Sequence, residues 1–258
     1  MRERLDIASR GGPSLAERAY RAIREEILRG QLRPGTPLSR RRLARELEMS
    51  IVPVADALRR LEDDGLVESR PRAGTRVRIP SEKDVRELYD LREALETQSA
   101  RLFAERATPA QRRELQRLAE EVDALFDRLA ASGQDPAFRF TVHSRHVGLH
   151  MHIAEHAGSG LLGEMIERNH VLILNWLFDV AGRRTALPPG FHARLAEELV
   201  SGDPARADAA MRAHVRYGLV EISGRIGALK ATEWRERPAA GRGGRAAARR
   251  GGAAAGGG

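Results

Sequence analysis

The sequence predicts a mainly α-helical protein with a small β element near its front and an all-helical bundle behind it. Three observations carry this prediction. Apolar residues recur at helical spacing over most of the chain, between residues that favour helix starts and ends. Strand-like runs occur only between residues 66 and 78. Aromatic residues, which strands favour, make up only 4% of the sequence, and this argues against a large all-β fold.

The length of 258 residues suggests two domains with flexible ends. We expect the first domain at residues 13–80 and the second at residues 81–232, with a mobile arm at 1–12. Residues 233–258 are dominated by Gly, Ala and Arg. Such a segment has little to bury, so we expect a disordered tail there.

The composition excludes several classes of protein. Apolar residues make up 41% and charged residues 31%, which is ordinary globular usage and argues against a mainly disordered chain. The lack of cysteine excludes disulfides, thiolate zinc sites, iron–sulfur clusters and cysteine nucleophiles. No apolar run approaches the roughly 20 residues of a membrane span, and the first residues lack a signal peptide's apolar segment. We therefore expect a soluble, cytoplasmic protein with no membrane partner.

The positive charge is concentrated at the two ends of the chain. The formal net charge is +8, and residues 1–80 carry 18 Arg and Lys against 12 Asp and Glu. Residues 81–232 carry 20 against 22. A basic front domain on a near-neutral body indicates a polyanionic partner, most often nucleic acid. The alternative is that this chain simply favours arginine, since Lys83 and Lys230 are its only lysines.

Three helices follow from the start signals of the first domain. Ser14 is a good N-cap for a first helix that runs to about Arg29. Ser39 begins a second, shorter helix, and Ser50 begins a third that runs to about Asp63. A short helix that leads into a second one is typical of helix-turn-helix proteins, in which the later helix enters the major groove of DNA.

Two short strands, 66–68 and 75–78, complete the first domain. The turn between them contains Arg70 and Arg72. Three helices followed by a basic hairpin form a winged helix-turn-helix, and these two arginines can reach phosphates or the minor groove. The alternative is a small helical domain that makes protein contacts.

A run of residues at fixed spacing narrows the interpretation. It comprises Leu38, Ser39, Leu43, Ala44, Leu47, Ser50, Pro53, Val54, Ala57, Leu58, Leu61, Gly65, Leu66, Val67, Gly74, Thr75 and Val77. In spacing and identity this run resembles the DNA-binding domain of the GntR family of bacterial transcription regulators, over about residues 14–80. The resemblance implies that Arg41, Ser50 and the start of the third helix face DNA, with the wing around Arg72 and Gly74 beside them.

Three positions depart from the family pattern. Ile51 and Val52 stand where the family usually has Arg-Thr, and Ala55 stands where it usually has an arginine. Such arginines read guanine through paired hydrogen bonds. Readout in this chain must therefore shift to thymine methyl groups, to the second helix or to the wing. The expected DNA-contacting residues are Arg40, Arg41, Arg42, Ser50, Ile51, Val52, Ala55, Arg70, Arg72 and Gly74.

The second domain is expected to be an all-α bundle of about six helices, because no strand signal interrupts its helical pattern. The first helix runs from Ser81 to the Thr108-Pro109 break, where the second begins. The third opens at Asp135-Pro136 and extends to about residue 157. The other three are expected at 161–180, 191–201 and 204–226. Such a bundle is typical of a ligand-binding or dimerisation domain.

All eight histidines lie in this second domain: His143, His146, His150, His152, His156, His170, His192 and His214. His146 and His150 are four residues apart, so they project from one helical face and can share a metal ion, with His143 nearly on that face. His152 and His156 make a competing pair on another face. Spacing alone leaves the choice between the pairs open, and a single histidine is more often a hydrogen-bonded structural residue.

A second resemblance favours one pair. His192 lies ten residues before Gly202-Asp203, Met211 and His214 form a Met-x-x-His element, and Arg92-x-x-Leu95-Glu96 opens the domain. This pattern resembles the FCD effector domain of the FadR-like branch of the GntR family. The resemblance implies a divalent metal ion on His146, His150, His192 and His214. His146 departs from the family pattern, because it stands at a position where the family usually has aspartate.

The implied donor set has consequences for chemistry. Four imidazoles are neutral, so the site suits zinc or nickel better than magnesium or calcium. A cation without a carboxylate ligand should attract an anionic effector, such as a small organic acid, to an open coordination position. We expect Arg92 to contact that effector, and Asn169 and Asn175 are further candidates for the cavity wall.

These inferences lead to one functional expectation and two alternatives. We expect a homodimeric transcription regulator, a repressor, that binds a palindromic operator in double-stranded DNA and responds to an effector at the metal. One alternative is a structural protein that binds any duplex through charge alone. The other is a metal-dependent hydrolase, which the sequence disfavours because it lacks His-Glu-x-x-His, Gly-x-Ser-x-Gly and phosphate-cradling motifs. We therefore expect no enzymatic activity.

Overall fold

The computed structural model describes residues 12–132, 135–180 and 187–226. The arm expected at 1–12 and the tail expected at 233–258 lie outside these residues, apart from Gly12. The described chain has two separate hydrophobic cores. One is formed by residues between Ala19 and Val77, and the other by residues between Val85 and Ile222.

The first core is enclosed by three helices: α1 (Leu15–Leu28), α2 (Arg40–Glu46) and α3 (Ile51–Asp63). Their starts confirm the predicted signals. The Ser14 side chain accepts a hydrogen bond from the backbone N–H of Glu17, and Ser39 caps α2 in the same manner. Ser50 occupies the N-cap position of α3, but its side chain makes no capping hydrogen bond.

A three-stranded antiparallel sheet forms the wing, in the order β1-β3-β2. The strands are β1 (Pro37–Leu38), β2 (Val67–Arg70) and β3 (Gly74–Val77). The predicted hairpin is present, with its strands shifted by one or two residues at their ends. Strand β1 was not predicted; it consists of two residues, which pair with Thr75 and Arg76 of β3.

The second core lies within a bundle of long helices. These are α4 (Glu82–Arg106), α5 (Pro109–Ser132), α6 (Pro136–His156), α7 (Gly160–Val180), α8 (Phe191–Val200) and α9 (Pro204–Ile226). All six lie where the sequence predicted them, to within a few residues. Ser81 and Asp84 form a capping box at the start of α4, and Asp135 caps α6. None of the described helices is long and apolar enough to cross a membrane.

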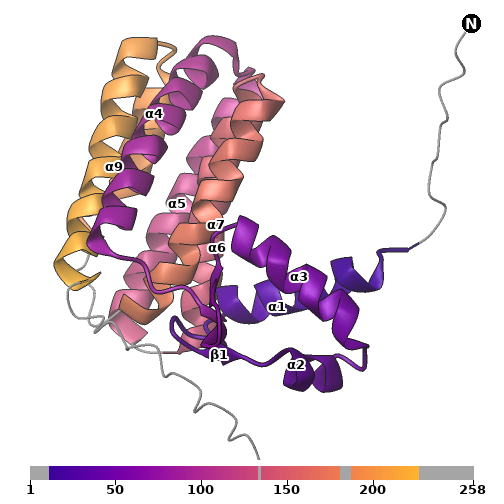
Figure 1. The fold of residues 1–258 in the computed structure, drawn as a ribbon. Coiled ribbons are helices and arrows are strands. Elements are labelled where there is room, and N and C mark those ends of the chain that lie inside the picture. The colour runs from indigo at the N-terminus through magenta and orange to yellow at the C-terminus, as the bar shows by residue number, and fades with distance from the viewer. Residues whose placement is uncertain (1–11, 133–134, 181–186, 227–258) are drawn as a thin grey trace, which may run out of the picture.

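Helices α4 and α9 lie side by side along the bundle, as Figure 1 shows. Gly218 permits their close approach, since a Cβ atom there would lie 3.3 Å from the Tyr89 ring. On another side, Arg112 of α5 links two helix ends. Its guanidinium donates to the backbone oxygens of Ala104, Ala107 and Val200, at 2.6, 3.0 and 2.7 Å. The carbonyls at the ends of α4 and α8 are thereby satisfied.

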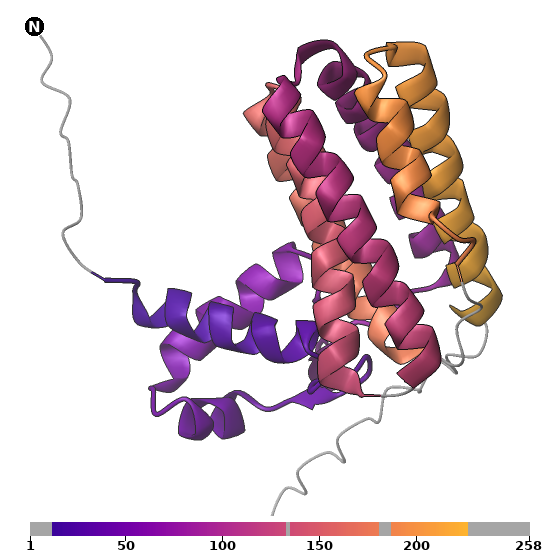
Figure 2. The same cartoon turned by 180° about the vertical axis from the view of Figure 1, so that it is seen from behind.

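The first domain lies beside one end of the bundle, next to α6 and α7 (Figures 1 and 2). Two contacts define this junction. Arg168 of α7 donates to the backbone oxygen of Asp63 at 3.0 Å and lies 3.5 Å from the carboxylate of Asp64. The guanidinium of Arg29 lies over the ring of Phe140, 5.1 Å from its centroid. The end of α3 is therefore in direct contact with the bundle.

Candidate DNA surface and metal centre

The residues expected to contact DNA lie mostly at the surface of the first domain. The exposed ones are Arg40, Arg41, Arg42, Ser50, Ile51, Val52, Arg70, Arg72 and Gly74, and Ala55 is half-buried. Val52 is 69% exposed and Ile51 is 48% exposed, so both side chains are available for contact with thymine methyl groups. Arg42 lies 3.6 Å from Glu46. Arg72 sits at the tip of the wing with a φ of 66°, which turns the chain sharply between β2 and β3.

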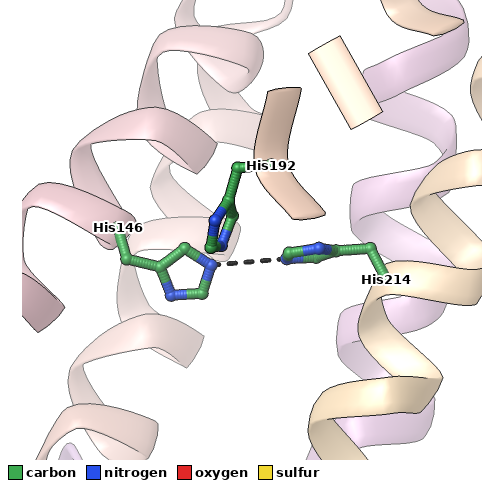
Figure 3. A group of neighbouring side chains, drawn as sticks. All are labelled: His146, His192 and His214. Atoms are coloured by element: carbon green, nitrogen blue, oxygen red, sulfur yellow. Dashed lines mark hydrogen bonds between the residues drawn. The ribbon is translucent and has the colours of Figure 1, made fainter. Parts of the chain in front are cut away.

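The four histidines of the expected metal set lie together inside the bundle. His146 and His150 come from α6, His192 from the start of α8, and His214 from α9. Figure 3 shows the rings of His146, His192 and His214 converging from three helices. Nitrogen atoms of these three rings lie within 4.8 Å of one another. His150, His192 and His214 are buried, at 2%, 1% and 6% exposed, and His146 is partly buried.

The distances between ring nitrogens fit a metal ion. The Nε2 atoms of His146 and His150 are 3.0 Å apart, those of His146 and His214 are 3.3 Å apart, and those of His150 and His214 are 3.2 Å apart. In a tetrahedral zinc site, with Zn–N bonds of about 2.0–2.1 Å, ligand nitrogens lie about 3.3–3.4 Å apart. The Nε2 triangle is therefore of the size that a zinc or nickel ion requires.

Arg92 and Glu96 make polar contacts with both nitrogen atoms of the His150 ring. Arg92 Nη2 lies 3.3 Å from His150 Nε2, and Arg92 Nε donates to Glu96 Oε1 at 2.5 Å. His150 Nδ1 in turn lies 2.5 Å from Glu96 Oε2. Because a guanidinium only donates, Nε2 must be the accepting nitrogen of this ring, and Nδ1 must carry the hydrogen. Nε2 therefore carries the lone pair of the ring, and a metal ion in the triangle would take that lone pair in place of the Arg92 N–H.

His192 is oriented by Asp123 of α5. His192 Nδ1 lies 2.6 Å from Asp123 Oδ1, and the Asp123 carboxylate also accepts from the backbone N–H groups of His192 and Ala193. The N-cap residue of α8 is Gly190, which has no side chain to cap the helix. Asp123 therefore caps α8 from a neighbouring helix and also holds the ring at its first turn.

The electrostatics of the centre favour neutral imidazoles beside ionised carboxylates. Burial lowers the pKa of His150 to about 4, although Glu96 opposes the shift, and burial together with the neighbouring rings lowers the pKa of His146 and His214 well below the usual value. Burial would raise the pKa of Glu96, but Arg92, His150 and His170 hold that pKa well below its usual range. Neutral imidazole is the form that binds metals.

The other histidines are engaged elsewhere. His152 and His156, the competing pair, each contact a backbone oxygen: that of Gln111 at 3.0 Å and that of His152 at 2.8 Å. His143 is buried with its ring edge-on to Phe126. His170 of α7 lies 3.2 Å from Glu96 Oε1, so it joins the polar cluster behind His150 rather than the Nε2 triangle.

Sequence reasoning identified the histidines of the centre but missed three residues around it. Glu96 contacts the ring of His150 and Asp123 contacts the ring of His192, and His170 contacts Glu96. A signal existed for Glu96, which lies four residues after Arg92 on a helix face that is otherwise apolar. Asp123 and His170 meet the centre only through the packing of α5 and α7, which no local pattern reveals. Asn169 is buried, with no partner for its Nδ2 atom among the described residues, and the side chain of Asn175 lies outside the described set.

Together, the winged helix-turn-helix and the helical bundle have the architecture of a two-domain DNA-binding regulator. Comparison with known families agrees in both parts. Residues 15–77 match the bacterial regulatory proteins of the GntR family, and residues 87–217 match the FCD domain. The chain therefore belongs to the GntR family of bacterial regulatory proteins and carries an FCD domain.

Individual relatives support this assignment. The chain is 33% identical over 99 residues to the HTH-type transcriptional regulator YdfH of Escherichia coli O6:H1, a match that covers 38% of this chain and 43% of YdfH. The chain thus spans less than half of that relative. It is 29% identical over 209 residues to LutR of Bacillus subtilis, covering 73% of this chain and 92% of LutR. A GntR regulator structure from Rhodococcus sp. RHA1 shares the fold, with a TM-score of 0.67, 22% identity and coverage of 81% and 97%.

Proposed function

We propose that this protein represses transcription from a palindromic operator and that a small carboxylate, bound at a divalent metal ion in the bundle, controls its affinity for DNA. The ion is zinc or nickel, held by His146, His150, His192 and His214. The observation that carries the proposal is the triangle of Nε2 atoms with edges of 3.0–3.3 Å. The ion would supply an open coordination position for the carboxylate.

Arg92 is the residue best situated to recognise the effector. Its guanidinium is only 4% exposed and lies 3.3 Å from the His150 Nε2 atom, at the rim of the triangle. A guanidinium carries five N–H groups, and those of Arg92 are only partly engaged by Glu96, His150 and Tyr89. The remaining donors match a carboxylate in charge and geometry, which favours an organic acid as the effector.

The DNA-binding half of the proposal rests on the surface of α2, α3 and the wing. Arginines of α2 and the wing would contact phosphates, which fix position, while Ile51 and Val52 would contact thymine methyl groups at the base edges. Two copies of the chain would address two half-sites, in the manner of dimeric helix-turn-helix proteins. The absence of recognition arginines predicts an operator with A·T pairs where relatives read guanine.

Metal analysis tests the first half. Purified protein, dialysed against zinc or nickel and then against metal-free buffer, should retain one ion per chain. His150→Ala should lose it, because that change removes one corner of the triangle. His156→Ala is the matched control, since His156 lies on the same helix but contacts the ring and backbone oxygen of His152 instead of the triangle. Full retention in the His150 variant would refute the site.

Duplex selection tests the second half. Random duplexes enriched on the protein should yield a palindrome, and binding to it should exceed binding to unrelated duplexes at every salt concentration. Equal affinity for all duplexes, with a slope set only by salt, would instead indicate a structural DNA-binding protein. A panel of small carboxylates, screened by thermal shift with zinc present, should contain one that weakens operator binding.

A further inference from the structure

We infer that Glu96 and Asp123 act as positioning residues that restore, behind the histidine rings, the negative charge that the ligand set lacks. This inference rests on the proposed metal site. It assigns a purpose to two carboxylates that sequence analysis did not connect with the centre, and it predicts that they determine how tightly the ion is held.

The first step of the argument concerns geometry. Asp123 Oδ1 is hydrogen-bonded to His192 Nδ1 at 2.6 Å, and Glu96 Oε2 lies 2.5 Å from His150 Nδ1 in a close contact that lacks hydrogen-bond alignment. Each carboxylate therefore faces the ring nitrogen that is remote from the Nε2 triangle. A carboxylate at that place fixes the hydrogen on Nδ1, aims Nε2 inward and raises the basicity of the ring.

The second step concerns charge. The four imidazoles contribute none, because the proposed ligand at the usual aspartate position is His146. Behind them lie two carboxylates, Glu96 and Asp123, and one guanidinium, Arg92. The balance of these three groups is one negative charge. A divalent ion in the triangle would thus meet the same net charge that one carboxylate ligand would provide, at a greater distance.

The third step concerns the cost of keeping these groups. Glu96 and Arg92 are 2% and 4% exposed, and a buried ion pair is often no more stabilising than apolar residues of similar volume. Glu96 also contacts two histidines at once, His150 and His170. A purely structural pair would not need to be placed against a ring of the candidate metal site. The arrangement is explained if the carboxylate tunes that ring.

The test is the zinc affinity of Glu96→Gln and Asp123→Asn, measured in the full chain by competition with a chromophoric chelator. Each amide keeps the shape of the side chain but loses one acceptor and the charge. We expect each variant to bind zinc 10- to 100-fold more weakly, as for other partners of metal-bound histidines. Glu105→Gln on α4 and Asp127→Asn on α5 are matched controls, because both residues are exposed and should leave the affinity unchanged.

A spectroscopic measurement separates positioning from ligation and from misfolding. With Co²⁺ in place of zinc, the two variants should retain the wild-type absorption spectrum at saturation, because the four nitrogen ligands remain. His150→Ala should change that spectrum. If Glu96→Gln leaves Arg92 uncompensated and fails to fold, the double substitution Arg92→Gln/Glu96→Gln removes both charges together, and Asp123→Asn tests the inference independently.

The outcomes are distinguishable. Wild-type protein that binds no zinc or Co²⁺ overturns the proposed function itself. Wild-type binding with unchanged affinity in the folded Glu96 and Asp123 variants overturns only the inference. An altered Co²⁺ spectrum in either variant also overturns it, since that result would make the carboxylate a ligand or a general structural support. Weaker zinc binding with an unchanged spectrum supports it.

Discussion

The three hydrogen bonds of Arg112 predict a large and specific loss of stability on substitution. Arg112→Ala would free the backbone oxygens of Ala104, Ala107 and Val200, which its guanidinium reaches at 2.6–3.0 Å. A hydrogen bond to a charged group contributes about 1.5–3 kcal/mol. Because Arg112 is half-buried, water can reach some of the freed oxygens, and we expect a total loss of about 3 kcal/mol rather than the sum.

Urea unfolding measures this loss. Helical circular dichroism is a suitable signal, because the six long helices of the bundle contribute most of it. With an m-value of about 3 kcal/mol/M, the midpoint should fall by about 1 M. Arg112→Lys should lose about 2 kcal/mol, because one ammonium cannot reach three oxygens that a planar fork spans. Arg113→Ala, which changes an exposed neighbour, is the control. A urea midpoint of Arg112→Ala within about 0.1 M of the midpoint of that control would refute the reasoning.

Three further predictions concern the centre, the junction and the wing. Burial lowers the pKa of His150 to about 4, against about 6.5 in an unfolded chain, so the unfolded chain takes up the proton at a higher pH than the folded one. The free energy of unfolding of the metal-free protein should therefore fall by about 3 kcal/mol as the pH falls from 6.5 to 4. An unchanged urea midpoint across that range would contradict this prediction. Zinc binding should change hydrogen exchange at residues 61–66 in the wild-type protein, and Arg168→Ala should abolish that change. A wild-type response in this variant would exclude the contact between Arg168 and Asp64 as the link between the metal centre and the first domain. Arg72→Ala should weaken binding to all duplexes alike and reduce the salt slope by about 1, whereas a loss confined to one sequence would indicate base readout.

Much of the fold could be predicted because the helix boundaries are encoded locally. Ser14, Ser39 and Ser81 cap helices through hydrogen bonds to residues three positions later, so the start signal and the structure it creates lie in one short segment. β1 shows the limit of this approach. Two residues contain no periodicity, and the strand exists only because the distant β3 offers hydrogen-bonding partners.

The residues of the candidate centre also divide into those that a local sequence pattern predicts and those that depend on tertiary packing. His146 and His150 share a helical turn, so their proximity follows from spacing alone. His192 and His214 could be added only through resemblance to a family, because their approach depends on how α8 and α9 pack. Asp123 and His170 had no signal of either kind. Residues that orient a site are harder to predict than its ligands, because many different helices can supply them.

The course of α7 has a mechanical consequence. His170 contacts the buried Glu96, and Arg168, two residues earlier, contacts the end of α3. At about 100° per residue, the two side chains leave the helix in nearly opposite directions. A continuous helix is stiff over so short a distance, so the contacts of His170 and Arg168 belong to one rigid segment of α7. Any rotation of α7 that repositions His170 must therefore move Arg168 in the opposite direction and disturb its contacts with Asp63 and Asp64 at the end of α3.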